Sequence, residues 1–562
     1  MTEADGPADE LVRRSRRLGD LAERRLALAP RSPAALEHAR QLRDHLEGFV
    51  KPRAAEIDAP ILVVLMGPTG AGKSSILNAI AGANVSRAGV LRPTTREAVL
   101  YADPEDARLL RAHGRLRLIP PDRLILAAAP RSNAGVAIID APDIDSVERE
   151  NRALADTLLE ACDLCVFVTT ATRYADLVPW DVLHRIRQRE VPLVIVVNRL
   201  PKSTDDRAVV LADAERLFAE HDLRQMSGKI EVIAIDEGDL DLEVQGVSRD
   251  AIAPLTARID KLTATSEERR QLAATALAGA LRGLVPLVAD VAADLEREAV
   301  DSEALRRIAH VAYEDERSKL TAALRSGVLL RAEVLRQWQD FVGADQIARF
   351  VSSGLGRLRG LLLFAIRGTP VAPVASVEEN MTSSLEALTL RHASEAARRT
   401  AQLWSERSDA AALVDADPTL WSASPTLSPA LRETLRTWMH GVIDEVRTAS
   451  GRKHAVARVA AIGVNAVGVA VMLAVFAHTA GLTGAEFGIA AGTAFLNQKL
   501  LEAIFGERAM EELVASAGRK LDEGLAALFA RDRERFEALV ADASALGQLA
   551  TDLRADVQGL RT

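Results

Sequence analysis

The sequence predicts an α/β domain with a doubly wound, mostly parallel sheet, joined to a large all-α helical bundle or stalk that carries an apolar helical hairpin. Short apolar runs alternate with helical stretches between residues 58 and 264, as in a parallel sheet with crossover helices. After residue 264 the apolar residues recur at helical steps instead. Residues 459–477 then lack any charge. With 562 residues, the chain is long enough for about three domains.

Composition narrows the function classes. The 70 Lys and Arg against 79 Asp and Glu give a net charge of -9, which argues against a dedicated nucleic-acid binder that relies on phosphate neutralisation.

The two cysteines, Cys162 and Cys165, exclude a disulfide scaffold. They lie beside and within the apolar run LCVFVTT, so we expect buried thiols, with redox chemistry of the C-x-x-C spacing as the alternative. Because no apolar segment follows the charged N-terminus, we expect a cytoplasmic protein.

The first expected element is an N-terminal helical region over residues 1–57 that joins the bundle. Ser32 is predicted as an N-cap and Pro33 as the first helical residue of a helix that runs toward Pro52. The α/β domain is expected over 58–264. Its predicted strands are Ile61 to Met66, Val136 to Asp140, Leu164 to Thr169, Leu193 to Asn198 and Ile230 to Ile235.

A phosphate-binding loop follows the first of these strands. The pattern G-x-x-x-x-G-K-S lies between that strand and a helix that starts at Ser74, which is the context that a P-loop requires. Glycines let backbone N–H groups turn toward phosphate oxygens. Lys73 is expected to bind the β and γ phosphates, and the Ser74 hydroxyl to bind Mg²⁺. The predicted nucleotide-binding residues here are Gly67, Pro68, Thr69, Gly70, Ala71, Gly72, Lys73, Ser74 and Ser75.

Two downstream segments fit a nucleotide switch. Thr94 or Thr95, twenty or so residues after Ser74, would meet Mg²⁺ and the γ-phosphate, and the choice between them stays open. Asp140 ends an apolar strand, which suits a carboxylate that holds the Mg²⁺ shell through water. The predicted metal site therefore consists of Ser74, Thr94 or Thr95, and Asp140.

The ordered set GPTGAGKSSILNAI, RPTT, DAPD and NRLP resembles the G1 to G4 motifs of the dynamin and Era-like branch of P-loop GTPases. The layout of the whole chain resembles bacterial dynamin-like proteins. The resemblance implies GTP and GDP binding, Mg²⁺-dependent GTP hydrolysis and self-assembly, as a homodimer or larger, through the GTPase domains. It implies catalytic roles for Lys73, Thr94 or Thr95, and Asp140. Asn198 and Arg199 would stand at the first two positions of the base-reading N-K-x-D motif.

The sequence departs from the family pattern at four positions. Arg199 replaces the lysine of N-K-x-D, and Pro201 replaces the aspartate that binds guanine, so guanine selectivity is a family inference only. Asp143 replaces the glycine of D-x-x-G, which restricts the turn. Gly70 stands where cation-assisted relatives carry Asn or Ser. Arg92 and Arg96 beside the threonines are either transition-state cations or solvated surface residues.

Residues 265–453 are predicted as a helical bundle or stalk. Apolar residues at three- and four-residue steps form one buried face from Leu277 to Leu295, with a bend at Pro286. A second such face runs through Leu521, Leu525, Leu528, Phe536 and Leu539, in a C-terminal helix expected to return over 499–562.

Residues 454–498 are predicted as an apolar hairpin. The segment 459–477 would extend about 28 Å as a helix, close to the hydrocarbon thickness of a bilayer. The second arm, 487–496, is too short to span alone. Basic residues flank both ends, namely Arg447, Arg452, Lys453, Arg458, Lys499 and Arg508. We expect residues 459–496 to contact the lipid bilayer, with a buried helical pair as the alternative.

The leading hypothesis is a cytoplasmic, membrane-associated dynamin-like GTPase that couples GTP hydrolysis to membrane binding or remodelling. Two alternatives remain open. One is an Era-like GTPase switch that binds ribosome or RNA, and the other is a nucleotide-binding scaffold with little hydrolysis, which Asp143 and Pro201 motivate.

Overall fold

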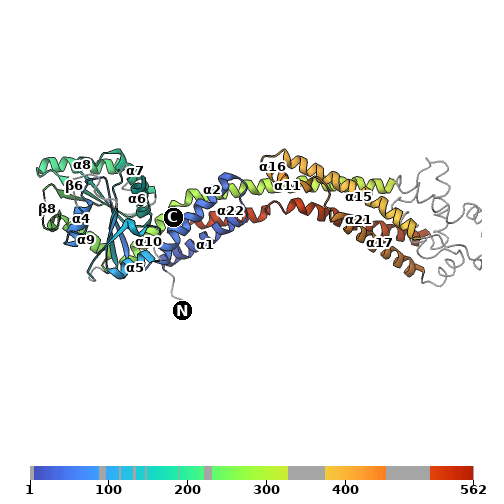
Figure 1. Cartoon of the computed structure of the whole chain (residues 1–562), viewed down its shortest axis with the longest axis horizontal. Helices are drawn as coiled ribbons and strands as arrows, with labels where there is room; N and C mark the ends of the chain where they lie inside the picture. The colour runs from blue at the N-terminus through green and yellow to red at the C-terminus, as the bar shows by residue number, and fades with distance from the viewer. Residues whose placement is uncertain are drawn as a thin grey trace, which may run out of the picture. The chain divides into compact units, whose positions relative to one another are not determined.

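The computed structural model describes residues 6–87, 97–112, 115–130, 134–145, 149–188, 190–220, 231–238, 240–326, 374–450 and 507–560 (Figure 1). They divide into two compact units. The first contains Met1–Glu298 and Ser544–Thr562, and the second contains Ala299–Ala543.

A seven-stranded sheet forms the centre of the first unit, in the order β3-β2-β4-β1-β5-β6-β7. The pairs β1 with β4, β1 with β5, β5 with β6, and β6 with β7 are parallel, whereas β2 runs antiparallel to β4. The predicted doubly wound, mostly parallel sheet is therefore confirmed. The strands are β1 (Ile61–Met66), β2 (Ala98–Ala102), β3 (Leu124–Ala128), β4 (Val136–Asp140), β5 (Leu164–Thr170), β6 (Leu193–Leu200) and β7 (Glu231–Asp236).

Helices cover both faces of the sheet (Figure 1). Apolar residues of one sheet face pack on α5, α6, α7 and α8, and α4 and α9 contact the sheet as well. The bounds are α4 (Lys73–Ala81), α5 (Pro104–Ala112), α6 (Arg149–Ala161), α7 (Leu177–Gln188), α8 (Thr204–Glu220) and α9 (Arg249–Thr263), with a small ribbon of β8 (Leu240–Asp241) and β9 (Gly246–Val247).

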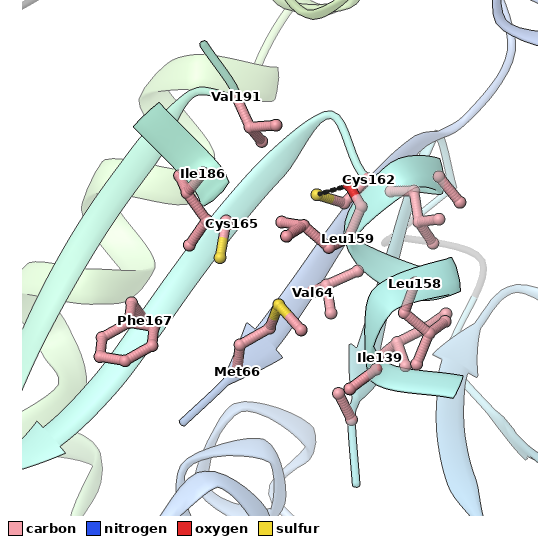
Figure 2. Close-up of a cluster of buried hydrophobic side chains, with 14 of the residues drawn as sticks. Val64, Met66, Ile139, Leu158, Leu159, Cys162, Cys165, Phe167, Ile186 and Val191 are labelled. Carbon is pink, nitrogen blue, oxygen red and sulfur yellow. Dashed lines mark hydrogen bonds between the residues drawn. The ribbon is translucent and has the colours of Figure 1, made fainter. Parts of the chain in front are cut away.

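The two cysteines lie in the apolar core between one face of the sheet and the helices α6 and α7 (Figure 2). Cys162 and Cys165 are both free thiols and fully buried, which confirms the prediction of buried thiols. Burial raises the pKa of Cys162 to about 12 and raises that of Cys165 well above its usual value. Thiols with raised pKa values in apolar surroundings are poor nucleophiles, so redox chemistry is not supported.

Helices from both ends of the chain pack together in the first unit. They are α1 (Pro7–Ala27), α2 (Pro33–His45), the π-helical turn η1 (Leu46–Val50), α3 (Lys51–Ala55), α10 (Ser266–Gly283), the start of α11 (Val285–Ser326) and α22 (Ala543–Gln558). The Ser32 side chain accepts a bond from the N–H of Ala35, so the predicted cap of α2 is confirmed. The fully buried Arg25 of α1 binds Glu298 of α11 at 2.7 and 2.9 Å.

The second unit is helical among its described residues. It contains the rest of α11, α15 (Val374–Ser405), α16 (Ala411–Ala416), the short 3₁₀ turn η5 (Pro418–Trp421), α17 (Leu427–Ser450) and α21 (Glu507–Glu537). Its core includes a cluster of four aromatic rings, namely Tyr313, Trp404, Phe529 and Phe536. The buried Tyr313 hydroxyl donates to Asp532 at 2.7 Å, so the polar end of this ring is satisfied.

The predicted buried helix faces are confirmed. Leu277 and Leu281 of α10 and Val288, Val291 and Leu295 of α11 are buried. The chain breaks at Leu284, between α10 and α11, rather than bending at Pro286, because a proline fits the first turn of a new helix, where its missing N–H costs nothing.

The C-terminal segment forms two helices, α21 and α22, rather than the single returning helix that the sequence predicts. Leu521, Leu525, Leu528 and Phe536 are buried on α21 as expected, and Leu539 packs against the same core. Arg306 donates to the carbonyls of Glu537 and Val540 at 3.4 and 3.2 Å. These bonds provide a side-chain donor to carbonyls at the last residue of α21 and in the turn that follows it.

One helical stretch of the described chain, Ser266–Arg325, is long and apolar enough to cross a membrane, and half of its most apolar window is buried inside the protein. Core helices of soluble proteins share these features. The predicted hairpin over 454–498 lies outside the described residues.

Candidate phosphate-binding site

The loop between β1 and α4 has a backbone that only glycine fits at two points. Gly67 has φ +153°, and a Cβ there would lie 2.0 Å from the carbonyl oxygen of Val168. Gly72 has φ +102°, and a Cβ there would lie 2.3 Å from Nδ2 of Asn198. Gly72 is also the N-cap of α4, so the free N–H groups of the first helical turn, which include those of Ser74 and Ser75, begin directly after it. A helix N-terminus of this kind favours a bound anion.

Lys73 is buried and has three acceptors within reach. Its Nζ lies 2.6 Å from Oδ1 of Asp143, 3.0 Å from the carbonyl oxygen of Gly67 and 3.4 Å from that of Pro68. Asp143 is buried as well, with 6% of its surface exposed. The ion pair therefore forms between two desolvated groups, where a charge-assisted bond is strong.

Asp140 lies at the end of β4, directly opposite Leu65 at the end of β1. Its Oδ2 accepts bonds from the hydroxyls of Ser74 at 2.6 Å and Ser86 at 2.7 Å. The other oxygen, Oδ1, is buried and has no hydrogen-bond partner among the described residues. Complete burial raises the pKa of Asp140, although Lys73 and the two serine hydroxyls oppose this effect.

These groups fit a magnesium ion. Carboxylate and hydroxyl oxygens are ligands that Mg²⁺ accepts directly or through water, and a buried carboxylate oxygen without a partner is a costly group unless something binds it. Ser74 and Asp140 are therefore brought together as predicted for a metal site, whereas Thr94 and Thr95 lie outside the described residues, as do Arg92 and Arg96.

A second acid of the same segment binds the loop from the other side. Oδ1 of Asp145 accepts from the backbone N–H of Thr69 at 2.8 Å and from its hydroxyl at 2.7 Å. Arg173, in the turn after β5, donates to Oδ2 of Asp145 and to the carbonyl oxygen of Thr69, both at 2.9 Å. Burial alone would raise the pKa of Asp145, but the bonds from Thr69 and Arg173 outweigh it and lower this pKa.

Asn198 connects the loop to β6. Its Nδ2 donates to the carbonyl oxygen of Ala71 at 2.8 Å, and its Oδ1 accepts from the N–H of Arg199 at 2.8 Å. Arg199 has φ +57° and is exposed. Asn198 therefore fixes the phosphate loop to β6, which lies one strand beyond the neighbour of β1 in the sheet.

The structure adds residues that sequence reasoning does not find. The sequence predicts that Asp143 acts on the turn, yet its backbone avoids the left-handed region and its side chain binds Lys73. The spacing of Asp140, Asp143 and Asp145 is the available signal for a segment that lies along the loop. For Arg173 and Ser86 no local pattern exists, because tertiary contacts alone bring them to the site.

Comparisons with known proteins agree with this fold. Residues 62–199 match the protein family described as 50S ribosome-binding GTPase. A probable transmembrane GTPase, FZO-like and chloroplastic, of Arabidopsis thaliana is 27% identical over 147 residues, which are 26% of this chain and 16% of that protein. GTPase Der of Synechococcus sp. (strain CC9311) is 27% identical over 201 residues, which are 35% of this chain and 40% of that protein.

A solved structure from a study of an oligomerised bacterial dynamin pair, which the study links to long-range sensing and tethering of membranes, is 10% identical and has a TM-score of 0.38. That match covers 97% of this chain and 95% of the other. The chain spans less than half the length of the curated relatives named above. The family match confirms the predicted P-loop GTPase domain.

Proposed function

We propose that this P-loop GTPase domain binds and hydrolyses GTP with Mg²⁺ and that the rest of the chain couples the nucleotide state to membrane binding. The observation that supports the first half most strongly is the glycine-lined loop with the buried Lys73 at the start of α4. A loop of this kind binds the β and γ phosphates through backbone N–H groups and a lysine.

Each residue has a distinct role in this proposal. Lys73 binds phosphate oxygens, and Ser74 and Asp140 hold Mg²⁺, which neutralises phosphate charge when bound. Thr94 or Thr95 would complete the metal shell, as the family resemblance implies. Asn198 keeps the loop in the conformation that points its N–H groups inward, because it binds the Ala71 carbonyl.

The membrane half of the proposal rests on the uncharged segment 459–477 and the basic residues that flank the hairpin. The similarity to a protein named a transmembrane GTPase also supports association with a membrane. We propose a cytoplasmic protein that associates with the membrane through residues 459–496 and self-assembles through its GTPase domains. Switch segments that respond to the γ-phosphate would bias the helical stalk between two states.

The test measures GTP hydrolysis by the purified chain with and without liposomes that contain anionic lipid. We expect hydrolysis that requires Mg²⁺, is lost in Lys73→Ala and rises with liposomes, together with co-sedimentation of the protein with the liposomes. Hydrolysis that liposomes leave unchanged, in a protein that stays in the supernatant, contradicts the membrane half. Light scattering with and without a GTP analogue tests self-assembly. We expect a larger mass with the analogue than for the nucleotide-free chain.

A second candidate function is a GTPase switch that binds the ribosome. The match of residues 62–199 to a family described as ribosome-binding favours it, whereas the net charge of -9 does not. Co-sedimentation with ribosomes, in parallel with the liposome assay, distinguishes the two. Binding to ribosomes in the presence of a GTP analogue, without binding to liposomes, would support this candidate.

A further inference from the structure

We propose that Asp143 sets the nucleotide affinity of the site, because its carboxylate holds Lys73 in an ion pair that the phosphates must break. This inference rests on the proposed function. Asp143 stands where the family pattern has a glycine, so the competing carboxylate belongs to this chain rather than to the general motif.

The bonds of Lys73 leave no free donor for a phosphate. An ammonium group has three N–H donors, and Nζ already has three acceptors in Asp143, Gly67 and Pro68. A phosphate oxygen must therefore displace an acceptor, and displacing the Pro68 carbonyl, which is bound weakly at 3.4 Å, would leave the phosphate beside the Asp143 carboxylate. The two carbonyls belong to the loop backbone itself, whereas Asp143 reaches Lys73 with a side chain from the segment after β4.

Charge selects Asp143 as the group that leaves. A carboxylate and a phosphate in contact with one ammonium group repel each other. Because Lys73 and Asp143 are both buried, little water screens this repulsion. Asp140 adds a second carboxylate close by, and Lys73 acts on it electrostatically. A nucleotide phosphate therefore has to displace the carboxylate that already forms an ion pair with Lys73.

The same segment is attached to the loop at two further points. Asp140 accepts from Ser74, and Asp145 accepts from the N–H and hydroxyl of Thr69. These contacts hold the segment 140–145 along the phosphate loop, so the Asp143 carboxylate is kept beside Lys73 rather than free to move into solvent. We name the segment 140–145 the acidic clip.

The test compares nucleotide affinity by calorimetry in the intact chain with Mg²⁺, using GTP and GDP. Asp143→Asn keeps the shape of the side chain and removes its charge. It is expected to bind both nucleotides at least about tenfold more tightly than the natural chain, a change of the size that loss of one charge-assisted bond predicts. Asp415→Asn, at an exposed acid of α16, is the matched control, because it changes the net charge equally in the unit that does not contain the loop.

A double-mutant cycle shows whether the gain acts through Lys73. In a Lys73→Ala background, Asp143→Asn should bring a clearly smaller gain, since the competition for the lysine is gone and only the direct repulsion between carboxylate and phosphate is relieved. A gain of the same size in both backgrounds overturns the proposal. Asp143→Gly, which restores the family residue, replaces Asp143→Asn if thermal unfolding shows that the latter does not fold.

The outcomes separate this inference from the proposed function. Unchanged or weaker nucleotide binding in a folded Asp143→Asn variant, alongside measurable binding by the natural chain, overturns the proposal about Asp143. The GTPase proposal is then unaffected. Absence of binding in every variant overturns both. Equal gains in Asp143→Asn and Asp415→Asn also overturn the proposal about Asp143, because they would reflect net charge alone.

Discussion

Gly67 has no room for a side chain at the point where β1 becomes the phosphate loop. A Cβ there would lie 2.0 Å from the Val168 carbonyl oxygen of the neighbouring strand. Gly70, three residues on, has φ +73°, but a Cβ added to it would meet no atom within 4 Å. The two positions therefore separate a steric requirement from a conformational one.

Gly67→Ala is expected to lower the free energy of unfolding by at least about 2 kcal/mol, because the backbone of β5 would have to move. Gly70→Ala should lower it by only about 1 kcal/mol, the usual cost of a left-handed conformation. Chemical denaturation measures both. Equal losses at the two positions would contradict the steric explanation.

The buried carboxylate of Asp140 lowers the stability of the fold at neutral pH, although the proposed function needs it to hold Mg²⁺. Burial raises its pKa above the unfolded value, so the folded state favours the protonated form. The contribution of this group to stability is therefore fully present below the unfolded pKa and declines as the pH rises through the raised pKa.

Asp140→Asn should accordingly raise the unfolding temperature at neutral pH and change it little in acid. The same variant should weaken Mg²⁺-dependent nucleotide binding by more than about tenfold. Thermal unfolding at several pH values and calorimetry with Mg²⁺ test the two halves. A lower unfolding temperature at neutral pH would show that the carboxylate stabilises the fold instead.

Among the elements, the strands that carry the site follow from the sequence more readily than those at the edge. β1 and β4 to β6 are short apolar runs, of which β4 ends at Asp140 and β6 contains Asn198, and the sequence predicts each to within two residues. It does not predict β2 and β3, because Ala98–Ala102 and Leu124–Ala128 are short and alanine-rich, which suits helices equally well. Their place in the sheet depends on pairing with β4 and with each other.

The site is predictable in part for the same reason. The P-loop and the acid at the end of β4 have a fixed spacing from their strands, so Lys73, Ser74 and Asp140 follow from local pattern. The partners Arg173 and Ser86 reach the site through tertiary contacts that no local pattern encodes.

A buried ion-pair cluster joins α3 to the sheet. Asp163, fully buried before β5, lies 2.5 Å from Nη1 of Arg115 and 3.7 Å from Nε of Arg53, and it accepts from the N–H of Leu62. Both arginines are almost completely buried. The carboxylate therefore balances two desolvated positive charges.

Asp163→Ala is expected to cost about 3–5 kcal/mol of stability, because it leaves the buried Arg53 without this carboxylate and Arg115 with only the longer contact to Glu56 at 3.8 Å. Glu105→Ala, which removes an exposed pair with Arg108, should change stability little and serves as the control. Chemical denaturation of the two variants checks this. A loss in Asp163→Ala no larger than that in Glu105→Ala would contradict the structural role of the cluster.

At the scale of the whole molecule, the two units divide the proposed functions. The first unit contains the phosphate loop and the helices from both chain ends, and the second unit is helical among its described residues. The proposed membrane segment is inserted in the sequence between α17 and α21 of the second unit. Nucleotide binding and lipid binding should therefore be separable by deletion.

Replacement of residues 454–498 by a short Gly/Ser linker is expected to abolish co-sedimentation with liposomes and to leave GTP affinity unchanged. Liposome sedimentation and calorimetry on the same preparation measure the two properties. Retained lipid binding in this variant would place the membrane contact elsewhere in the chain.

Calorimetric titration of the intact chain with GTP and with ATP, in the presence and absence of Mg²⁺, tests the central claim most directly. The account predicts saturable binding of GTP that tightens with Mg²⁺ and weakens by at least about a hundredfold in Lys73→Ala. Binding of neither nucleotide by the folded chain, with Mg²⁺ present, would contradict the claim that the loop after β1 is a phosphate site.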